Sequence, residues 1–580
     1  MAELFGIRRK TVRKEKVVSC VNSGEINLSE GEMTMDSMIV CPEPHAAEAG
    51  REVLANGGNA VDAAIAAAFV QSVTNPLMCG LGGTGLLYFY NGSTRRRTII
   101  DCEVSIPSRS VPVSWQEQYV GRSETVGRHI ISSEANQLGH QSVMVPGFVR
   151  GCWYAYERYG SGHIAWSELL SPAINLAQKG FQVYPYIANF WNDGDGEGRP
   201  GYPGTMAKLK ATPDAERTYL RPAGSYFQNG DWLVQQELGQ TIQRLADAGG
   251  EDFYTGDIAR EISKDFDAHD GLISTGDLEH YPVYETEPLQ GRYRNLEVTS
   301  TPFPSNGPTV IQMLQILDHF DLSALGHHTP EYIDTFARIQ RAAFADNVQL
   351  KCMDVQAAKP LERKIISPER AAYWATRVAK GERLVLENGV ISGGTTHLTC
   401  VDGERNIASF THSIGSIAGS GVVTPGLGFL FNNFLGHYNP VPGHPDSIEA
   451  GRRFGGGVPT ILFNDGEPVL AVGAPGGSRL ISSVVQSLVN ALDHGMGMRE
   501  AVSVPRFHSE ERQLLYLEPA TPESVAEALR SLGNEVQRST YMSRVQAIRI
   551  RSDGGRLEAG PDPRGGAGVG YVGSAANNIG

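Results

Sequence analysis

The spacing of apolar residues near the start of the chain predicts two helices followed by a strand. Residues 46–56 have apolar positions at helical spacing, and Gly57-Gly58 predicts the end of that helix. Asn59 is placed to cap a second helix, AVDAAIAAAFVQSV, which is alanine-rich on all sides and therefore predicted to be buried between layers. The run LLYFY after the next turn has the composition of a strand.

Further along, helical periods give way to strands. The predicted helices cover 172–183, 237–249, 309–320 and 332–350, with a hairpin over 285–304 and a charged, flexible segment over 354–394. After Thr395, residues 396–401 and 407–413 flank Asp402-Gly403 and predict a hairpin. A second hairpin, TILF-NDGE-PVLAV, leads through GAPGGSR into the amphipathic helix LISSVVQSLVNALDHG.

A glycine-rich turn precedes the LLYFY strand and imitates a nucleotide-binding motif. Gly80, Gly82 and Gly85 fit G-x-G-x-x-G, but that fingerprint requires a strand before it and a helix after it. The predicted order here is the reverse. The turn is therefore interpreted as a place where backbones pass closely.

Composition narrows the class of protein. A chain of 580 residues predicts two to four domains or one large α/β body, and its net charge of −14 argues against nucleic-acid binding. No apolar run approaches about 18 residues and no signal-peptide core is found, so we predict no membrane partner and a cytoplasmic location. The seven cysteines lack any C-x-x-C pair, which predicts reduced thiols. We expect no cofactor and no metal.

The stretch SGGTTHLTCV places Gly394 directly before Thr395. Alone, it is more typical of a glycine turn that enters a strand. Its chemical alternative is that the chain is cut before Thr395, because the new α-amine, with an ordinary pKa of about 7.7–8, can act as general base for the hydroxyl beside it. Glycine at 394 suits this, since it tolerates a strained backbone.

Two further stretches fit this chemistry. Gly476 and Gly477 precede an apolar helix, where backbone N–H groups can bind a developing oxyanion. Ser413 ends the strand that returns from Thr395, and its hydroxyl is placed to orient the threonine.

In combination the motifs resemble the γ-glutamyltransferase (γ-glutamyltranspeptidase) family of N-terminal-nucleophile (Ntn) hydrolases. The matching stretches span residues from about 40 to 573 in family order: GGNAVDAAIAAAF, TNPLMCGLGGTG, VPGFVRG, SPAINLAQKGF, PFPSNG, FADN, TTHLTCVD, NNF, GAPGGSR, VPRFH and DPR.

The resemblance implies an α+β fold, a four-layer αββα sandwich made as a precursor that cuts itself into two chains. The expected division is a disordered extension over 1–36, a large chain over 37–394 and a small chain over 395–580. The chains are expected as a heterodimer, or as a dimer of such heterodimers. By resemblance Thr395 is the nucleophile, Ser413 its supporting hydroxyl, and Gly476 and Gly477 the oxyanion hole.

The residues with which the family binds the charged groups of a γ-glutamyl substrate, its clamp, are replaced at the matching positions of this chain. Cys102 stands where an arginine is expected and Gly415 where an asparagine is expected. Phe434 and His437 replace polar clamp residues, and the pair Gly455-Gly456 replaces two serines. Losing charged hydrogen bonds of about 1.5–3 kcal/mol each disfavours a zwitterionic substrate. The side chains that remain as candidates for binding an anion in another way are Arg452, Arg453, Arg479, His412 and His437.

The sequence therefore predicts a self-processing threonine amide hydrolase or acylase that acts through an acyl-Thr395 ester on a small-molecule amide other than an ordinary γ-glutamyl compound. One alternative is a γ-glutamyltransferase or glutathione hydrolase with a rearranged clamp. Another, of a different class, is a non-catalytic binding protein on the same scaffold.

Overall fold

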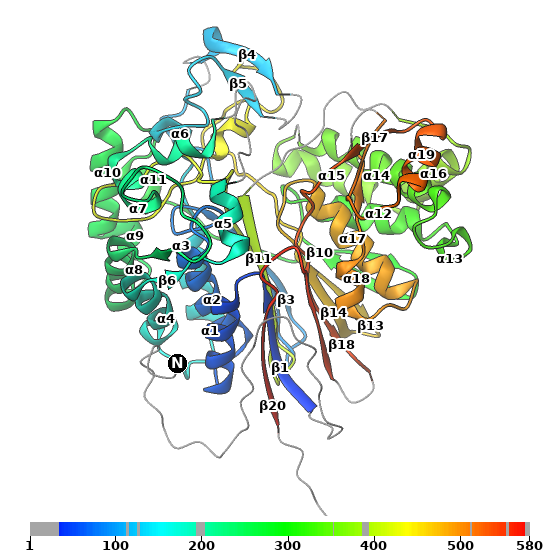
Figure 1. Ribbon diagram of the computed structural model, residues 1–580, viewed down its shortest axis with the longest axis horizontal. Helices are drawn as coiled ribbons and strands as arrows, with labels where there is room; N and C mark the ends of the chain where they lie inside the picture. The colour runs from blue at the N-terminus through cyan, green and yellow to red at the C-terminus, as the bar shows by residue number, and fades with distance from the viewer. Residues whose placement is uncertain are drawn as a thin grey trace, which may run out of the picture.

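The computed structural model of the chain describes residues 34–111, 115–123, 128–192, 203–351, 353–384, 394–510, 513–552 and 556–574. Two β-sheets lie at the centre of the molecule, and helices cover the outer face of each (Figure 1). The order of layers is helix, sheet, sheet, helix. The predicted αββα sandwich is confirmed.

Both central sheets are antiparallel. Within the described ranges the first sheet has seven strands, in the order β20 (Gly568–Ser574), β1 (Thr34–Cys41), β11 (Gly394–Val401), β12 (Ile407–Gly415), β2 (Thr84–Tyr90), β3 (Arg97–Cys102) and β8 (Tyr284–Thr286). The second has six described strands, in the order β19 (Leu557–Pro561), β18 (Gln546–Ile550), β14 (Glu467–Gly473), β13 (Thr460–Asn464), β10 (Leu296–Ser300) and β9 (Leu289–Tyr293). The hairpins β9–β10, β11–β12 and β13–β14 confirm the three that the sequence predicts.

The central strands are buried on both faces because their side chains alternate between two cores. In β2, Leu86 and Tyr88 pack between the sheets, whereas Leu87 and Phe89 face the helices. The core between the sheets also takes Ile461 and other side chains of the second sheet. A strand with two apolar faces shows a continuous hydrophobic run, which is what LLYFY is.

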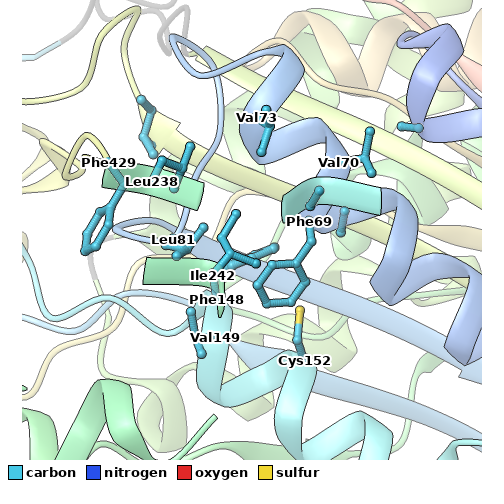
Figure 2. Close-up of a cluster of buried hydrophobic side chains, with 14 of the residues drawn as sticks. Phe69, Val70, Val73, Leu81, Phe148, Val149, Cys152, Leu238, Ile242 and Phe429 are labelled. Carbon is cyan, nitrogen blue, oxygen red and sulfur yellow. The ribbon is translucent and has the colours of Figure 1, made fainter. Parts of the chain in front are cut away.

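The first helical layer packs on the seven-stranded sheet. Its elements are α1 (Pro44–Ala55), α2 (Ala60–Thr74), α3 (Phe148–Tyr159), α4 (Trp166–Lys179), α5 (Pro185–Asn192), α6 (Thr205–Leu209), α7 (Pro213–Tyr219), α8 (Gln236–Ala248), α9 (Asp252–Thr255), α10 (Asp257–Ala268) and α11 (Thr275–Glu279). All of α2 is buried, as its alanine content predicts, and the Asn59 side chain accepts from the N–H groups of Val61 and Asp62 to cap it. Phe69 of α2 meets Phe148 of α3 at a ring-centroid distance of 5.4 Å, and the two lie near Ile242 of α8 (Figure 2).

The second helical layer packs on the six-stranded sheet. Its elements are α12 (Gly307–Leu317), α13 (Leu322–Leu325), α14 (Pro330–Lys351), α15 (Val355–Ile365), α16 (Pro368–Ala379), α17 (Arg479–Leu492), α18 (Met498–Ser503) and α19 (Glu523–Ser531). Helices α15 and α16 correct the prediction of a flexible segment over 354–394. Each keeps a narrow buried stripe, such as Ala371, Trp374 and Val378, under an otherwise charged surface. Residues 385–393 of that segment lie outside the described residues.

Short elements complete the fold. They are β4 (Tyr119–Arg122), β5 (His129–Ile131), β6 (Phe181–Gln182), β7 (Trp232–Leu233), β15 (Phe507–His508), β16 (Leu514–Leu517), β17 (Glu535–Arg538) and the 3₁₀ turns η3 (Gln116–Gln118), η4 (His140–Ser142) and η5 (Phe434–His437). Within the described ranges, no helix is both long and apolar enough to cross a bilayer. The five described cysteines, at positions 41, 79, 102, 152 and 400, are buried and form no disulfide with one another.

Of the extension predicted over residues 1–36, the described residues include only the last three. Strand β1 begins at Thr34 and pairs with β20, so residues 34–36 belong to the first sheet. Residues 1–33 lie outside the described residues.

The glycine turn before β2 is a site of close backbone approach, as predicted. A Cβ on Gly83 would lie 2.3 Å from the carbonyl oxygen of Ser413, and one on Gly82 would lie 2.6 Å from that of Leu430. The turn therefore packs directly against the end of β12. This contact fixes the place where the candidate site forms.

Candidate active site

Strand pairing brings Thr395 and Ser413 together. They are direct partners in the β11–β12 ladder, and the Thr395 hydroxyl donates to Ser413 Oγ over 3.2 Å. Ser413 Oγ in turn donates to the carbonyl oxygen of Gly394 and accepts from the N–H of Gly415 at 3.0 Å. A single serine thus holds the nucleophilic oxygen and polarises the carbonyl of the bond predicted to break.

Gly394 and Gly415 leave little room for side chains at the two strand ends. A Cβ at position 394 would lie 3.0 Å from the carbonyl carbon of Ser416, and the ladder is irregular between Gly394 and Thr395. Gly415, opposite Gly394, has φ of +98°, and a Cβ there would lie 2.4 Å from Asn433 Oδ1. Side chains on either residue would push the two strand ends apart.

A cavity of about 70 Å³ opens beside Thr395. One wall is aromatic: Phe434 and His437 of η5 pack on Phe454, with ring-centroid distances to Phe454 of 4.4 and 4.8 Å. The replacements that the sequence shows at 434 and 437 therefore lie in the same cavity as Thr395. Together with Phe454 they make that wall aromatic and largely apolar.

A run of glycines directly after Phe454 forms another part of the wall. Gly455, Gly456 and Gly457 all line the cavity. The amide of Asn306 donates to the Gly456 carbonyl oxygen over 2.9 Å, and a Cβ on Gly455 would lie 2.3 Å from the carbonyl carbon of Pro304. The wall is held by its backbone and offers no side-chain hydroxyl to a substrate.

Glu103 and Thr84 also line the cavity, although neither is among the site residues that the sequence predicts. Glu103 Oε1 accepts from the N–H of Gly456 at 3.1 Å, and Thr84 Oγ1 hydrogen bonds with Glu103 Oε2. Burial, together with the nearby charge of Asp101, raises the pKa of Glu103 to about 8 despite these hydrogen bonds. The sequence does hold one indication of this. Side chains alternate along a strand, so position 103, which follows β3, faces the side opposite to position 102.

Cys102 faces away from the cavity. Its thiol donates to the carbonyl oxygen of Gly85 over 3.0 Å and packs beside Gly151 of α3. Burial raises the pKa of this thiol well above its ordinary value. The structure therefore does not bring Cys102 together with the other predicted substrate-binding residues.

Arg452 and Arg453 also lie outside the small cavity. Arg453 forms a salt bridge with Asp101 and covers the ring of Tyr284 at 3.8 Å, and Arg452 donates to the carbonyl oxygen of Pro445 over 2.8 Å. Both line a second, larger cavity of about 860 Å³ that shares His437, Phe454 and Gly455 with the first. No arginine or lysine is among the described residues that line the small cavity.

The predicted oxyanion glycines precede α17. Gly476 has φ of +120° and Gly477 of +60°, a backbone region that favours glycine. Gly477 lines the cavity, whereas Gly476 packs behind it, with the site of a Cβ 3.5 Å from Ser543. Of the two predicted oxyanion glycines, Gly477 is therefore the one that shares the cavity with Thr395.

A buried ion pair supports that turn and explains the VPRFH and DPR motifs. Arg506 meets Asp562 at 2.6 Å, with both side chains almost fully buried. Arg506 also donates to the Ser543 carbonyl oxygen over 2.6 Å, and the Ser543 hydroxyl donates to that of Pro475. The two distant motifs therefore hold the loop that carries Gly476.

Two histidines next to the nucleophile are not available as its base. His412 hydrogen bonds with Gln71 over 2.8 Å on the helix side of β12, and His397 hydrogen bonds with Thr411 over 2.8 Å between the sheets. Burial lowers the pKa of each to about 3. Among the described residues, the hydroxyl of Thr395 hydrogen bonds with Ser413 and with no histidine, which agrees with the expectation that the α-amine serves as base. Arg479, another anion candidate, instead donates to Ser539 over 3.0 Å.

One cluster of potential metal ligands among the described residues lies elsewhere. Asp265 stands between His140 and His269, at 3.2 and 3.1 Å, and the two imidazoles stack at a centroid distance of 4.6 Å with 12° between their planes. Parallel stacked rings do not direct two nitrogen lone pairs at one ion. The cluster serves as a hydrogen-bonded link between η4 and α10.

The αββα sandwich and the hydroxyl pair at the start of β11 define the class of protein: an Ntn amide hydrolase. The gamma-glutamyltranspeptidase family model matches residues 46–572, and the chain belongs to that family. The alternative of a non-catalytic binding protein is not favoured.

Individual relatives agree with this class. The chain is 34% identical to an "Acylase ACY 1 proenzyme" of Pseudomonas sp. (strain V22), over 89% of this chain and 90% of that protein. It is 31% identical to the "Glutathione hydrolase proenzyme" of Bacillus subtilis (strain 168), over 92% and 91% of the two chains. The crystal structure of cephalosporin acylase from Bacillus halodurans is 25% identical and superposes with a TM-score of 0.78 over 95% of this chain and 99% of its own.

Proposed function

We propose that this enzyme hydrolyses amides with a short acyl group other than γ-glutamyl, through an acyl ester on Thr395. The small cavity beside Thr395 carries the proposal: it is lined by Phe434, Phe454 and three successive glycines, and by no described arginine or lysine. An α-carboxylate brought there would lose water without gaining a cationic partner, which is unfavourable.

The first step is self-cleavage. The Thr395 hydroxyl attacks the Gly394 carbonyl, which Ser413 polarises, and the peptide becomes an ester as the Thr395 nitrogen takes the proton. Water hydrolyses the ester and leaves a carboxylate on Gly394 and a free α-amine on Thr395. The result is a large and a small chain that stay together as a heterodimer.

Turnover repeats the same chemistry on a substrate. The α-amine takes the proton of the Thr395 hydroxyl, the oxygen attacks the amide carbonyl, and the N–H at Gly477 stabilises the oxyanion. The proton passes to the departing amine, and the acyl group stays on Thr395 as an ester. Water, deprotonated by the α-amine, then releases the acid.

The leaving amine has room in the larger cavity behind His437, Phe454 and Gly455. An acylase among the relatives supports the acyl-amide class, and a glutathione hydrolase among them supplies the alternative to test.

A panel of anilides tests the proposal. γ-Glutamyl, glutaryl, oxamyl and 4-carbamoylbutanoyl anilides are compared by kcat/KM with the purified, cleaved protein. We expect the γ-glutamyl compound to be hydrolysed at least about tenfold more slowly than the best of the others, since two charged groups lack partners. Turnover of the γ-glutamyl anilide alone would show instead that the enzyme has a rearranged γ-glutamyl clamp.

A further inference from the structure

The cavity contains a row of polar side chains, and only some of them have a role in the proposed mechanism. Ser413 pairs with Thr395 on one side and with Thr84 on the other, so three hydroxyls lie across three neighbouring strands on the same face of the sheet. Glu103, which follows β3, ends the row beside Thr84. Thr395 and Ser413 serve the reaction, whereas Thr84 and Glu103 have no assigned task.

We propose that Thr84 donates a hydrogen bond to an uncharged oxygen at the far end of the acyl group, and that Glu103 must be protonated for it to do so. The inference rests on the proposed function, because it concerns the acyl group bound beside Thr395. It makes Thr84 a specificity-determining residue for that group.

The hydrogen-bond inventory of Thr84 leads to this assignment. Its oxygen accepts from the N–H of Val104 at 2.9 Å, which leaves one lone pair and one proton. When Glu103 is ionised, the Thr84 proton points to its carboxylate. When Glu103 is protonated, the carboxyl donates to the remaining lone pair of Thr84, and the Thr84 proton turns to the cavity.

Glu103 has the surroundings for the protonated form. Its side chain is buried, and its pKa of about 8 leaves it mostly neutral at pH 7. The second oxygen still accepts from Gly456, so both protonation states of the pair are satisfied. The other ionisable groups that face Glu103 or the cavity are Asp101, Cys102, Tyr281, His412, His437, Tyr438 and Arg453.

Position in the sheet sets the length of the acyl group. Thr84 stands two strands from Thr395, which at about 4.8 Å per strand is roughly 10 Å between the backbones. Both side chains point into the same cavity from this distance. A linear acyl group of about five carbons places its terminal oxygen near Thr84 while its carbonyl carbon meets Thr395.

The test compares two anilides of the same shape. 4-Carbamoylbutanoyl anilide carries the terminal amide oxygen, and 5-methylhexanoyl anilide replaces that amide with an isopropyl group. The ratio of their kcat/KM values is measured from pH 6 to 9.5. The ratio cancels titration of the Thr395 α-amine, because both substrates need it equally.

We expect the wild-type ratio to favour the carbamoyl compound about three- to tenfold at pH 6.5 and to fall toward one as the pH passes about 8. Glu103→Gln keeps the ratio high at pH 9.5, since its side-chain NH₂ always donates to Thr84. Thr84→Val lowers the ratio at every pH, and Thr84→Ser restores it.

Three outcomes overturn the inference: a ratio near one in the wild type, a Thr84→Val variant with the wild-type ratio, or a Glu103→Gln variant that keeps the alkaline fall. The last would assign the titration to another group. Binding of glutaramide and 5-methylhexanamide is measured by calorimetry in parallel. An enzyme that hydrolyses none of the acyl anilides, glutaryl and oxamyl included, contradicts the proposed function, and the binding ratio then still decides the role of Thr84.

Discussion

At the scale of single residues, Ser413 links the two reactions that we propose for Thr395. Its oxygen touches the Thr395 hydroxyl, and its proton goes to the Gly394 carbonyl. After cleavage that carbonyl has become a carboxylate, and the same serine can orient the hydroxyl for turnover. One side chain therefore serves both the precursor and the mature enzyme.

Replacing Thr395 with alanine should leave the chain uncut. Without the hydroxyl no ester can form at Gly394, so we expect one species of 62.7 kDa by denaturing mass spectrometry and no amide hydrolysis. Thr395→Ser, which keeps the hydroxyl, is the matched control and should still split into two chains. A Thr395→Ala protein that divides at this bond would refute self-cleavage by Thr395.

Glu103 should make the folded protein less stable as the pH rises. Its pKa is about 8 when folded and ordinarily 4.5, so between these values the folded state binds more protons than the unfolded state. Its contribution is complete below about pH 4.5 and is lost as the pH passes 8. We expect the free energy of unfolding of Glu103→Gln to fall less steeply over this window in urea titrations. Identical slopes for the variant and the wild type would contradict a neutral Glu103.

At the scale of elements, neighbouring glycines in the wall over 455–457 differ in how well they would tolerate a side chain. A Cβ on Gly455 would meet the backbone of Pro304 and Ser305, at 2.3 and 2.6 Å. A Cβ on Gly456 would meet only the ring edge of Phe454, at 2.8 Å. Backbone cannot move aside as easily as a side chain.

Gly455→Ala should therefore be more harmful than Gly456→Ala. We expect the first to lose about 1–3 kcal/mol of unfolding free energy and to disturb the cavity. The second should keep stability and mainly change KM, because Phe454 turns slightly into the acyl site. Chemical denaturation and kinetics on one substrate measure both effects, and equal losses in the two variants would show that the wall is not held by Pro304.

At the scale of the whole molecule, the predicted cut divides the strands of each sheet between two chains. In the first sheet, β1 of the large chain lies between β20 and β11 of the small chain, and β12 of the small chain pairs with β2 of the large one. In the second sheet, β10 pairs with β13 across the same division. Separating the chains would break both sheets and the core between them.

The cleaved protein should consequently remain one particle. We expect two bands on a denaturing gel but a single native species, which elutes with uncut Thr395→Ala in size-exclusion chromatography. The two chains should unfold in one transition, since neither sheet survives alone. Release of the small chain under native conditions would contradict this interleaved arrangement.

The sequence by itself determined the elements and the central chemistry. Local periodicity predicts the hairpins and most helices, and the Gly394-Thr395 pair with Ser413 on the returning strand predicts the nucleophile and its partner, because a hairpin register is a local property. The charged segment over 354–394 was predicted as flexible, since the narrow buried stripes of α15 and α16 depend on packing against distant helices.

Only the tertiary structure decided what surrounds Thr395. Alternation along β3 says that residues 102 and 103 face opposite ways, but the stacking of two sheets and a helical layer decides that Glu103 meets the cavity and Cys102 meets α3. Likewise Arg453 belongs to a different cavity because Asp101, 352 positions away in sequence, neutralises it. These contacts join residues far apart in the chain, and no local pattern encodes them.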